Sequence, residues 1–157
     1  MLTRNFKQLI LGRAKSNNNN TALTSIKTLD GTISDNARSD YFGELSTNRY
    51  NMANNCPCIC IIIGSGNVSP SYEDYKLENM IDVAPTSINK FIDTSYENSR
   101  YLITALFENS TSDEWSISEA GVTASIPGTK CGLISREVFD PIIVPVGGSV
   151  TITMTIN

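Results

Sequence analysis

Residues 150–156 read Val-Thr-Ile-Thr-Met-Thr-Ile, a strict alternation of apolar side chains and threonines. Successive side chains of a β-strand point to opposite faces of the sheet, so the four apolar residues share one face and the three threonines share the other. β-Branched side chains suit such a half-buried, pleated surface. The stretch therefore predicts a strand with one face in a core and a polar outer face.

The same two-residue period continues upstream, where short strand candidates alternate with turn residues at the spacing typical of a sandwich or barrel. Turns are predicted at Asp30-Gly31 and at residues 145–148, and a long polar connection at residues 65–79. We expect an all-β protein: an antiparallel β-sandwich, immunoglobulin-like or jelly-roll-like, with a short N-terminal helix. The strand candidates upstream of the closing strand are residues 22–28, 41–45, 58–63, 88–95, 101–107, 115–124, 133–139 and 142–144.

Three of these candidates carry apolar residues in unusual positions. Residues 58–63 are apolar throughout, which indicates a central strand covered on both faces. Residues 101–107 are apolar on both sides, so this strand is either central or faces a partner. Within residues 115–124, Trp115 and Ile117 have the opposite parity to Ala120, Val122 and Ala124, so a β-bulge is expected near residues 118–121.

The chain divides into three parts by composition. Residues 1–15 suit an amphipathic helix or docking arm, residues 16–20 form an Asn-rich linker, and residues 21–157 form the β-sandwich domain. The first part reads either as a frayed terminus or as an anchor that docks into another subunit. The candidate partner-docking residues on it are Arg4, Phe6, Lys7, Leu9, Ile10 and Arg13.

Charge is distributed unevenly along the chain, whose net charge is −4. The first fifteen residues contain four basic residues and no acid, which leaves eight basic and sixteen acidic residues, a net −8, for the remainder. A body this acidic repels phosphate backbones, so we expect no general nucleic-acid binding by the β domain. No apolar run is long enough to span a bilayer and no signal peptide is indicated, so we expect a soluble protein with no membrane partner.

The residue types limit the chemistry. The chain contains no histidine, which excludes Ser-His-Asp and Cys-His nucleophilic pairs and metal sites built on imidazole. Its cysteines are Cys56, Cys58, Cys60 and Cys131; three of them are two residues apart in one segment, a spacing that rarely reaches disulfide geometry, so we expect reduced thiols packed as small apolar groups. We predict no catalytic residue, no cofactor and no metal, zinc being disfavoured by the same spacing.

An acidic, tyrosine-containing stretch stands out in the long connection. Paired carboxylates act as catalytic groups in glycosidases and as ligands in calcium sites, but no calcium-loop pattern is present. A solvated loop that contacts a neighbour is the better interpretation. Tyr72, Asp74 and Tyr75 are the candidate interface or receptor residues. Trp115 is expected in the core or at a subunit interface rather than stacked on a sugar.

Several stretches together resemble small virion proteins of tailed bacteriophages, found in the tail and head-fibre regions. The resemblance spans nearly the whole chain and rests on the order and spacing of the stretches. They are Met-Leu-Thr-Arg-Asn-Phe at residues 1–6, Ile-Gly-Ser-Gly at 63–66 leading to Pro70, Asp-Tyr-Lys-Leu-Glu-Asn at 74–79, Ser-Glu-Ala-Gly-Val at 118–122, and Leu-Ile-Ser-Arg-Glu-Val at 133–138 running through Pro145 and Gly148 to the last strand.

This resemblance implies a virion structural protein rather than an enzyme. The expected partners are other virion proteins, with the chain forming a homo-oligomer, for instance a trimer, that docks onto neighbouring tail or capsid proteins. It would be assembled into the virion in the bacterial host cytoplasm. The alternative is a host-receptor or carbohydrate-binding module of a virion, and a third hypothesis is a glycosidase that uses Glu73, Asp74 or Glu78.

Overall fold

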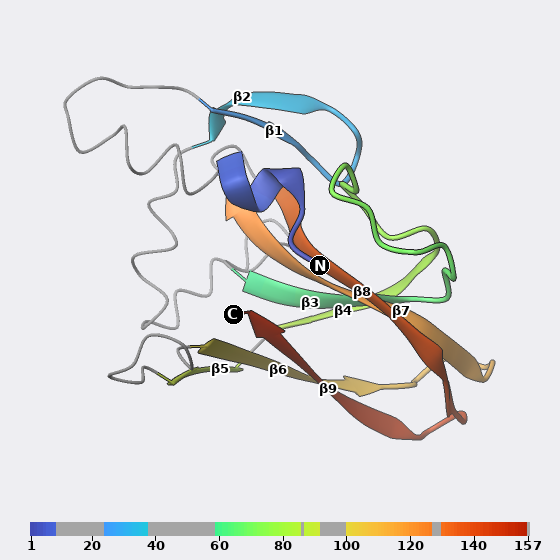
Figure 1. Ribbon diagram of the computed structural model, residues 1–157. Coiled ribbons are helices and arrows are strands. Elements are labelled where there is room, and N and C mark those ends of the chain that lie inside the picture. The colour runs from blue at the N-terminus through green and yellow to red at the C-terminus, as the bar shows by residue number, and fades with distance from the viewer. Residues whose placement is uncertain (9–23, 38–58, 86, 92–99, 127–129, 157) are drawn as a thin grey trace.

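The computed structural model describes residues 1–8, 24–37, 59–85, 87–91, 100–126 and 130–156. In these ranges the antiparallel strands form a two-stranded sheet β1-β2, a four-stranded sheet β4-β3-β7-β8 and a three-stranded sheet β5-β6-β9 (Figure 1). With the helical turn at residues 4–8, this is the predicted β-sandwich with a short N-terminal helix. The strands are β1 (Thr24–Lys27), β2 (Ile33–Ala37), β3 (Ile59–Gly64), β4 (Met80–Pro85), β5 (Ser87–Phe91), β6 (Arg100–Glu108), β7 (Trp115–Ile126), β8 (Lys130–Val144) and β9 (Ser149–Ile156).

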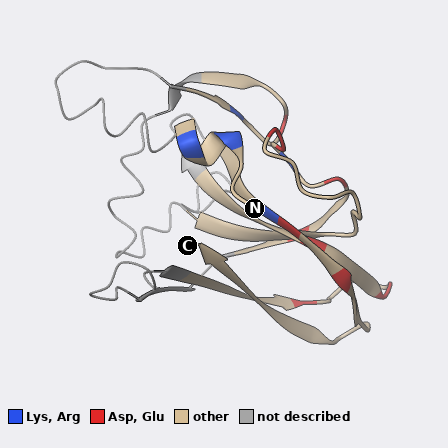
Figure 2. Cartoon of the chain, in the orientation of Figure 1, with Lys and Arg blue, Asp and Glu red and all other residues tan. Residues whose placement is uncertain are grey.

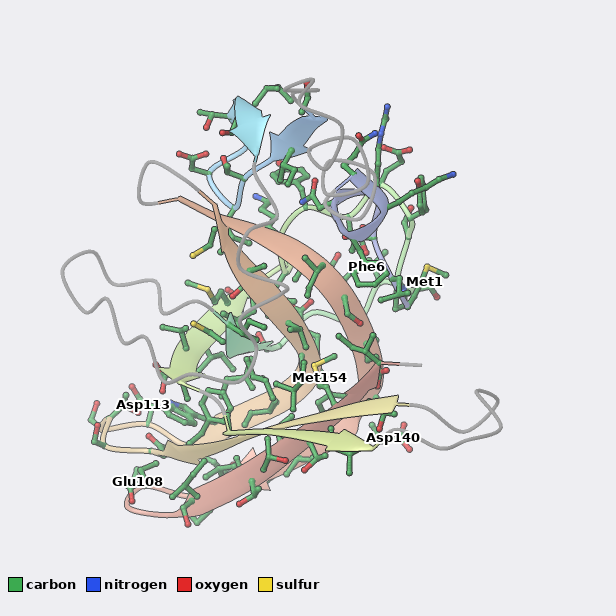
Figure 3. The ribbon with its side chains drawn as sticks, turned by 90° about the vertical axis from the view of Figure 1, so that its left-hand side faces the viewer. Met1, Phe6, Glu108, Asp113, Asp140 and Met154 are labelled. Carbon is green, nitrogen blue, oxygen red and sulfur yellow. The ribbon has the colours of Figure 1, made fainter. Side chains whose placement is uncertain are left out.

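The main core lies between the four-stranded and three-stranded sheets. All six residues of β3 are buried, and β3 lies between β4 and β7, so its prediction as a central strand is confirmed. From the opposite sheet, β9 contributes Ile152, Met154 and Ile156, while its threonines are exposed. Met154 points into the space between the sheets (Figure 3). The alternation in β9 therefore places its apolar side chains in the core and its threonines on the outer face, as predicted.

The predicted bulge in β7 is also present. The register between β7 and β8 shifts between Ile117 and Glu119, so Ile117 and Ala120 both reach the main core despite their opposite parity. Opposite this shift, β8 passes from Val138 to Ile142. The expected break at Asp140-Pro141 is therefore an irregularity inside one continuous 15-residue strand.

Other predictions differ from the structure or fall outside it. The strands β2 and β4 were not predicted, because β2 is mostly polar and β4 contains Asp82 and Pro85. Trp115 is buried in the main core, as one of its two expected placements. Residues 22–23, 41–45, 58 and 92–95, predicted as strand, lie outside the described residues.

The N-terminal segment packs against this same chain. Leu2 forms an isolated antiparallel bridge with Ser135 of β8, flanked by hydrogen bonds from the Thr3 amide to the Ile134 carbonyl (3.0 Å) and from the Arg136 amide to the Met1 carbonyl (3.0 Å). Residues 1–3 thus lie along the edge of β8. The helical turn at residues 4–8 follows, and no helix in the described ranges is long and apolar enough to cross a membrane.

One cysteine prediction is wrong. Cys131 is disulfide-bonded, whereas Cys60 is a buried thiol. The two-residue spacing disfavours a disulfide among Cys56, Cys58 and Cys60. It places no restriction on Cys131, which lies on β8, distant in sequence from the other three.

Candidate functional site

The predicted loop at residues 65–79 is fastened to the sheet by a buried carboxylate, Glu119. Oε1 of Glu119 accepts hydrogen bonds from the amides of Gly66 and Asn79, both at 3.0 Å, and Oε2 accepts one from the amide of Glu78 at 3.2 Å. The neighbouring Ser118 hydroxyl donates to the Gly66 carbonyl at 2.8 Å. One side chain of β7 therefore holds both ends of the loop.

Arg136 of β8 neutralises Glu119. Its Nε donates to Glu119 Oε2 at 3.0 Å, and its Nη1 donates to Asp74 Oδ2 at 2.8 Å. Nη2 lies 2.9 Å from Glu119 Oε2 and 3.8 Å from Glu78 Oε2 without hydrogen-bonding geometry, so its attraction to them is Coulombic. Burial alone would lower the pKa of Arg136, but the hydrogen bonds to Asp74 and Glu119 and their negative charges outweigh it and raise the pKa above its ordinary value.

Two glycines make room for this network. A Cβ atom on Gly64 would lie 2.5 Å from Glu119 Oε1 and 2.6 Å from the Asn79 carbonyl oxygen. A Cβ atom on Gly66 would lie 2.6 Å from both Glu119 Oε1 and Glu78 Oε2. Real Cβ atoms do not approach oxygen so closely, so the fastening of the loop depends on glycine at both positions.

The three candidate residues of the loop have different surroundings. Asp74 is engaged by Arg136, and the Tyr75 ring lies under the Lys27 ammonium, 3.8 Å from the ring centroid. Tyr72 is 44% exposed. Of the three, Tyr72 therefore has the most surface to offer a partner.

The candidate docking residues at the N-terminus also have different surroundings. Arg4 is exposed and pairs with Glu73 of the loop at 3.2 Å, and Lys7 is exposed. Phe6 is partly buried and packs against the main core of this chain. Leu9, Ile10 and Arg13, like the linker at residues 16–20, lie outside the described residues.

A second surface lies on the outer side of the three-stranded sheet. We call it the Thr–Leu face. On it, Thr104 of β6 and Thr153 of β9 are cross-strand neighbours whose hydroxyl oxygens are 3.1 Å apart, and Leu106 is 55% exposed. Charged residues lie mainly on the helical turn, β8 and the loops (Figure 2), but exposed Glu108, at the end of β6, lies on the same side of the sheet as Leu106. The Thr–Leu face consists of Leu102, Thr104, Leu106, Thr151, Thr153 and Thr155.

Sequence reasoning did not identify Glu119 and Arg136 as partners. A signal was present, because Glu119 is the one charged residue of the strand candidate 115–124 and Arg136 lies inside the candidate 133–139, and a buried charge needs an opposite charge. The pairing of β7 with β8, had it been known, would have identified Glu119 and Arg136 as partners.

The remaining chemistry of the described residues is limited. Among them, no group of three or more Cys, Asp or Glu residues is placed to hold a metal ion. Comparisons of this chain with protein-family models, with curated proteins and with solved structures found no match.

Proposed function

We propose that this chain is a non-catalytic structural subunit of a bacteriophage particle, which self-associates and docks onto neighbouring tail or capsid proteins. The observation that carries the docking role is the exposure of Leu106 on a strand that is apolar on both sides. Ile103, Ala105 and Phe107 of β6 point into the core and are at most 3% exposed, while Leu106 points outward.

The surroundings of Leu106 support a protein contact. One exposed leucine is common on protein surfaces and would mean little by itself. Here, however, Leu106 is accompanied by half-buried Leu102 and by uncharged threonines, with one charged residue, Glu108, at the end of the strand, in a chain of net charge −4. Depletion of charged residues at the centre of a surface is typical of protein interfaces.

The loop supports a structural role in place of a catalytic one. Asp74 and Glu119 bind Arg136, and Glu78 accepts hydrogen bonds from the amides of Asn67 (2.8 Å) and Val68 (3.0 Å). These carboxylates are engaged in holding the loop to the sheet. The phage setting rests on the pattern of sequence stretches described above.

The test replaces each of two apolar residues, similarly exposed but on different surfaces, by glutamate. Leu106→Glu places a charge on the Thr–Leu face, and Val68→Glu, at a residue 57% exposed, places one on the loop. Particles purified on a density gradient should contain the wild-type chain and the Val68 variant and lack the folded Leu106 variant. Absence of the wild-type chain from particles, or normal incorporation of the Leu106 variant, would overturn the proposal.

A host-receptor or carbohydrate-binding module is the second candidate, and exposed Tyr72 is the observation in its favour. Aromatic rings with one open face stack on sugars. In this case a glycan array or a host-cell binding assay should give a signal that Tyr72→Ala abolishes. Blank assays with the wild-type chain would rule this candidate out.

A further inference from the structure

The two sandwich sheets have four edge strands, and among the described residues β9 is the edge that carries no feature opposing further pairing. We infer that two copies of this chain pair through β9, antiparallel and edge to edge, so that their three-stranded sheets form one six-stranded sheet. The inference rests on the proposed self-association and names its interface. Edge strands present unpaired backbone amides and carbonyls, and proteins normally protect them with charges, prolines, bulges or a covering segment.

The other three edges carry such protection. The strand β4 contains the charged Asp82 and ends at Pro85, and proline cannot donate to a ladder. The edge of β8 is occupied by residues 1–3 at Ser135, and further along it contains the charged and irregular Asp140-Pro141. The strand β5 has only five residues. Each of these features opposes pairing with another chain.

β9 has none of these features. Its eight residues contain no charge, proline or glycine, and it runs in uninterrupted register with β6 from Ile156 opposite Tyr101 to Ser149 opposite Glu108. In the part of the chain that the structure describes, no strand pairs with its other side. A long, regular, uncharged edge is a template for another strand.

The composition of β9 suits a second copy of itself. In an isologous pair residue i contacts residue j of the second copy and residue j contacts residue i, so only the residue at the axis meets its own copy, and a charge there would face a like charge. With a two-fold axis perpendicular to the sheet at Thr153, Thr151 faces Thr155 of the second copy and Ile152 faces Met154 of the second copy. Opposed residues of an antiparallel pair lie on the same face of the sheet, so threonines meet threonines and apolar residues meet apolar residues.

This arrangement also extends the Thr–Leu face. The axis places the outer sides of both sheets on the same side of the dimer, because opposed side chains keep their face across the pair. Two Leu106 side chains, each on the strand next to β9, then lie on one continuous surface of threonines and leucines. A dimer of this kind would offer docking partners twice the surface of a single copy.

The test exploits the special position of Thr153 at the axis. Thr153→Lys and Thr153→Glu each place like charges opposite one another in the dimer and should weaken it about tenfold or more. An equimolar mixture of the two variants places Lys opposite Glu and should restore dimers. The matched control is Thr104→Lys, because Thr104 shares the face and contacts Thr153 but lies on the central strand β6.

The readout is mass by light scattering over a dilution series, with circular dichroism to establish that every variant is folded. The wild type and the Thr104 variant should reach twice the 17.1 kDa of one chain, and so should the mixture of the two Thr153 variants. Each single Thr153 variant should dissociate to the monomer at concentrations where the wild type is still dimeric. A wild-type monomer, a trimer, or dimers that tolerate Thr153→Lys would overturn the inference. Incorporation into particles and its loss in Leu106→Glu test the docking role separately, so either proposal can fail while the other stands.

Discussion

The guanidinium of Arg136 and the carboxylate of Glu119 form an ion pair in which Nε and Oε2 are 3.0 Å apart and both residues are at most 2% exposed. Burying either charge alone is costly, so the two depend on each other. The loop at residues 65–79 depends on both, because Glu119 holds the amides at its two ends.

Removing the cation should therefore destabilise the fold strongly. Arg136→Met leaves Glu119 buried without its partner and should lower the free energy of unfolding, measured with urea, by about 3–5 kcal/mol. Adding Glu119→Gln, which is neutral yet still supplies an acceptor oxygen, should recover part of this loss. Arg4→Met, which breaks the exposed pair with Glu73, is the control and should cost less than about 1 kcal/mol. Equal losses from Arg4→Met and Arg136→Met would contradict this account.

The raised pKa of Arg136 predicts how stability responds to alkali. A cation whose pKa is higher in the folded chain contributes stability that is fully present below its unfolded pKa and is lost only as pH rises through the folded value. For Arg136 that loss lies in strongly alkaline solution. Arg136→Lys, with an ordinary pKa of about 10.4, should lose stability relative to the wild type from about pH 10 upward. Urea titrations at a series of pH values measure the difference, and parallel curves for the two proteins would refute the prediction.

The two glycines beneath the loop should be difficult to replace. Gly64→Ala and Gly66→Ala force a Cβ atom into the space of Glu119 Oε1 and should loosen the loop, at a cost of about 1–3 kcal/mol. Limited proteolysis should then cut within residues 65–79. Gly147→Ala is the comparison, since nothing lies within 4 Å of its Cβ position and its φ of +75° strains only the turn. Loop cleavage that is the same in all three variants would show that the glycines are not required for close approach.

The two faces of β9 should respond in opposite ways to a carboxylate. Ile152→Asp buries an unpaired charge in the main core and should unfold the domain, whereas exposed Thr153→Asp should leave a folded chain with a cooperative melting transition. Circular dichroism and thermal melting distinguish them. A Thr153 variant that is as unstable as the Ile152 variant would mean that the outer face is buried as well.

The two described cysteines should differ in their reaction with an alkylating reagent. In protein denatured without reductant, Cys60 should be alkylated and Cys131 should not, and adding dithiothreitol should make Cys131 reactive. Peptide mass spectrometry reads both positions in one sample. Alkylation of Cys131 before reduction would show that its disulfide does not form.

The fold could be predicted wherever the side chains alternate or are uniformly apolar. The alternation from Val150 to Ile156 identified β9 and its inner face, and the parity change after Ile117 identified the bulge in β7. The strand β4 was missed because its own composition does not indicate a strand. Its extended conformation depends on its pairing with β3.

The clustering of Asp74 and Arg136 could not be predicted in the same way. The acidic loop was recognised, but its partner cation is 62 residues away in sequence and meets it only because β7 pairs with β8. The pairing of strands distant in the sequence is set by the whole sheet, and composition within one segment does not reveal it.

The fastening of the loop by Glu119 has a consequence for the order in which the chain folds. The amides of Gly66 and Asn79 have no carboxylate to bind until β7, which follows them in the chain, has paired with β3. Closing so long a segment costs chain entropy before any contact compensates it. The loop should therefore become resistant to proteases late in refolding, after the sheet below it has formed.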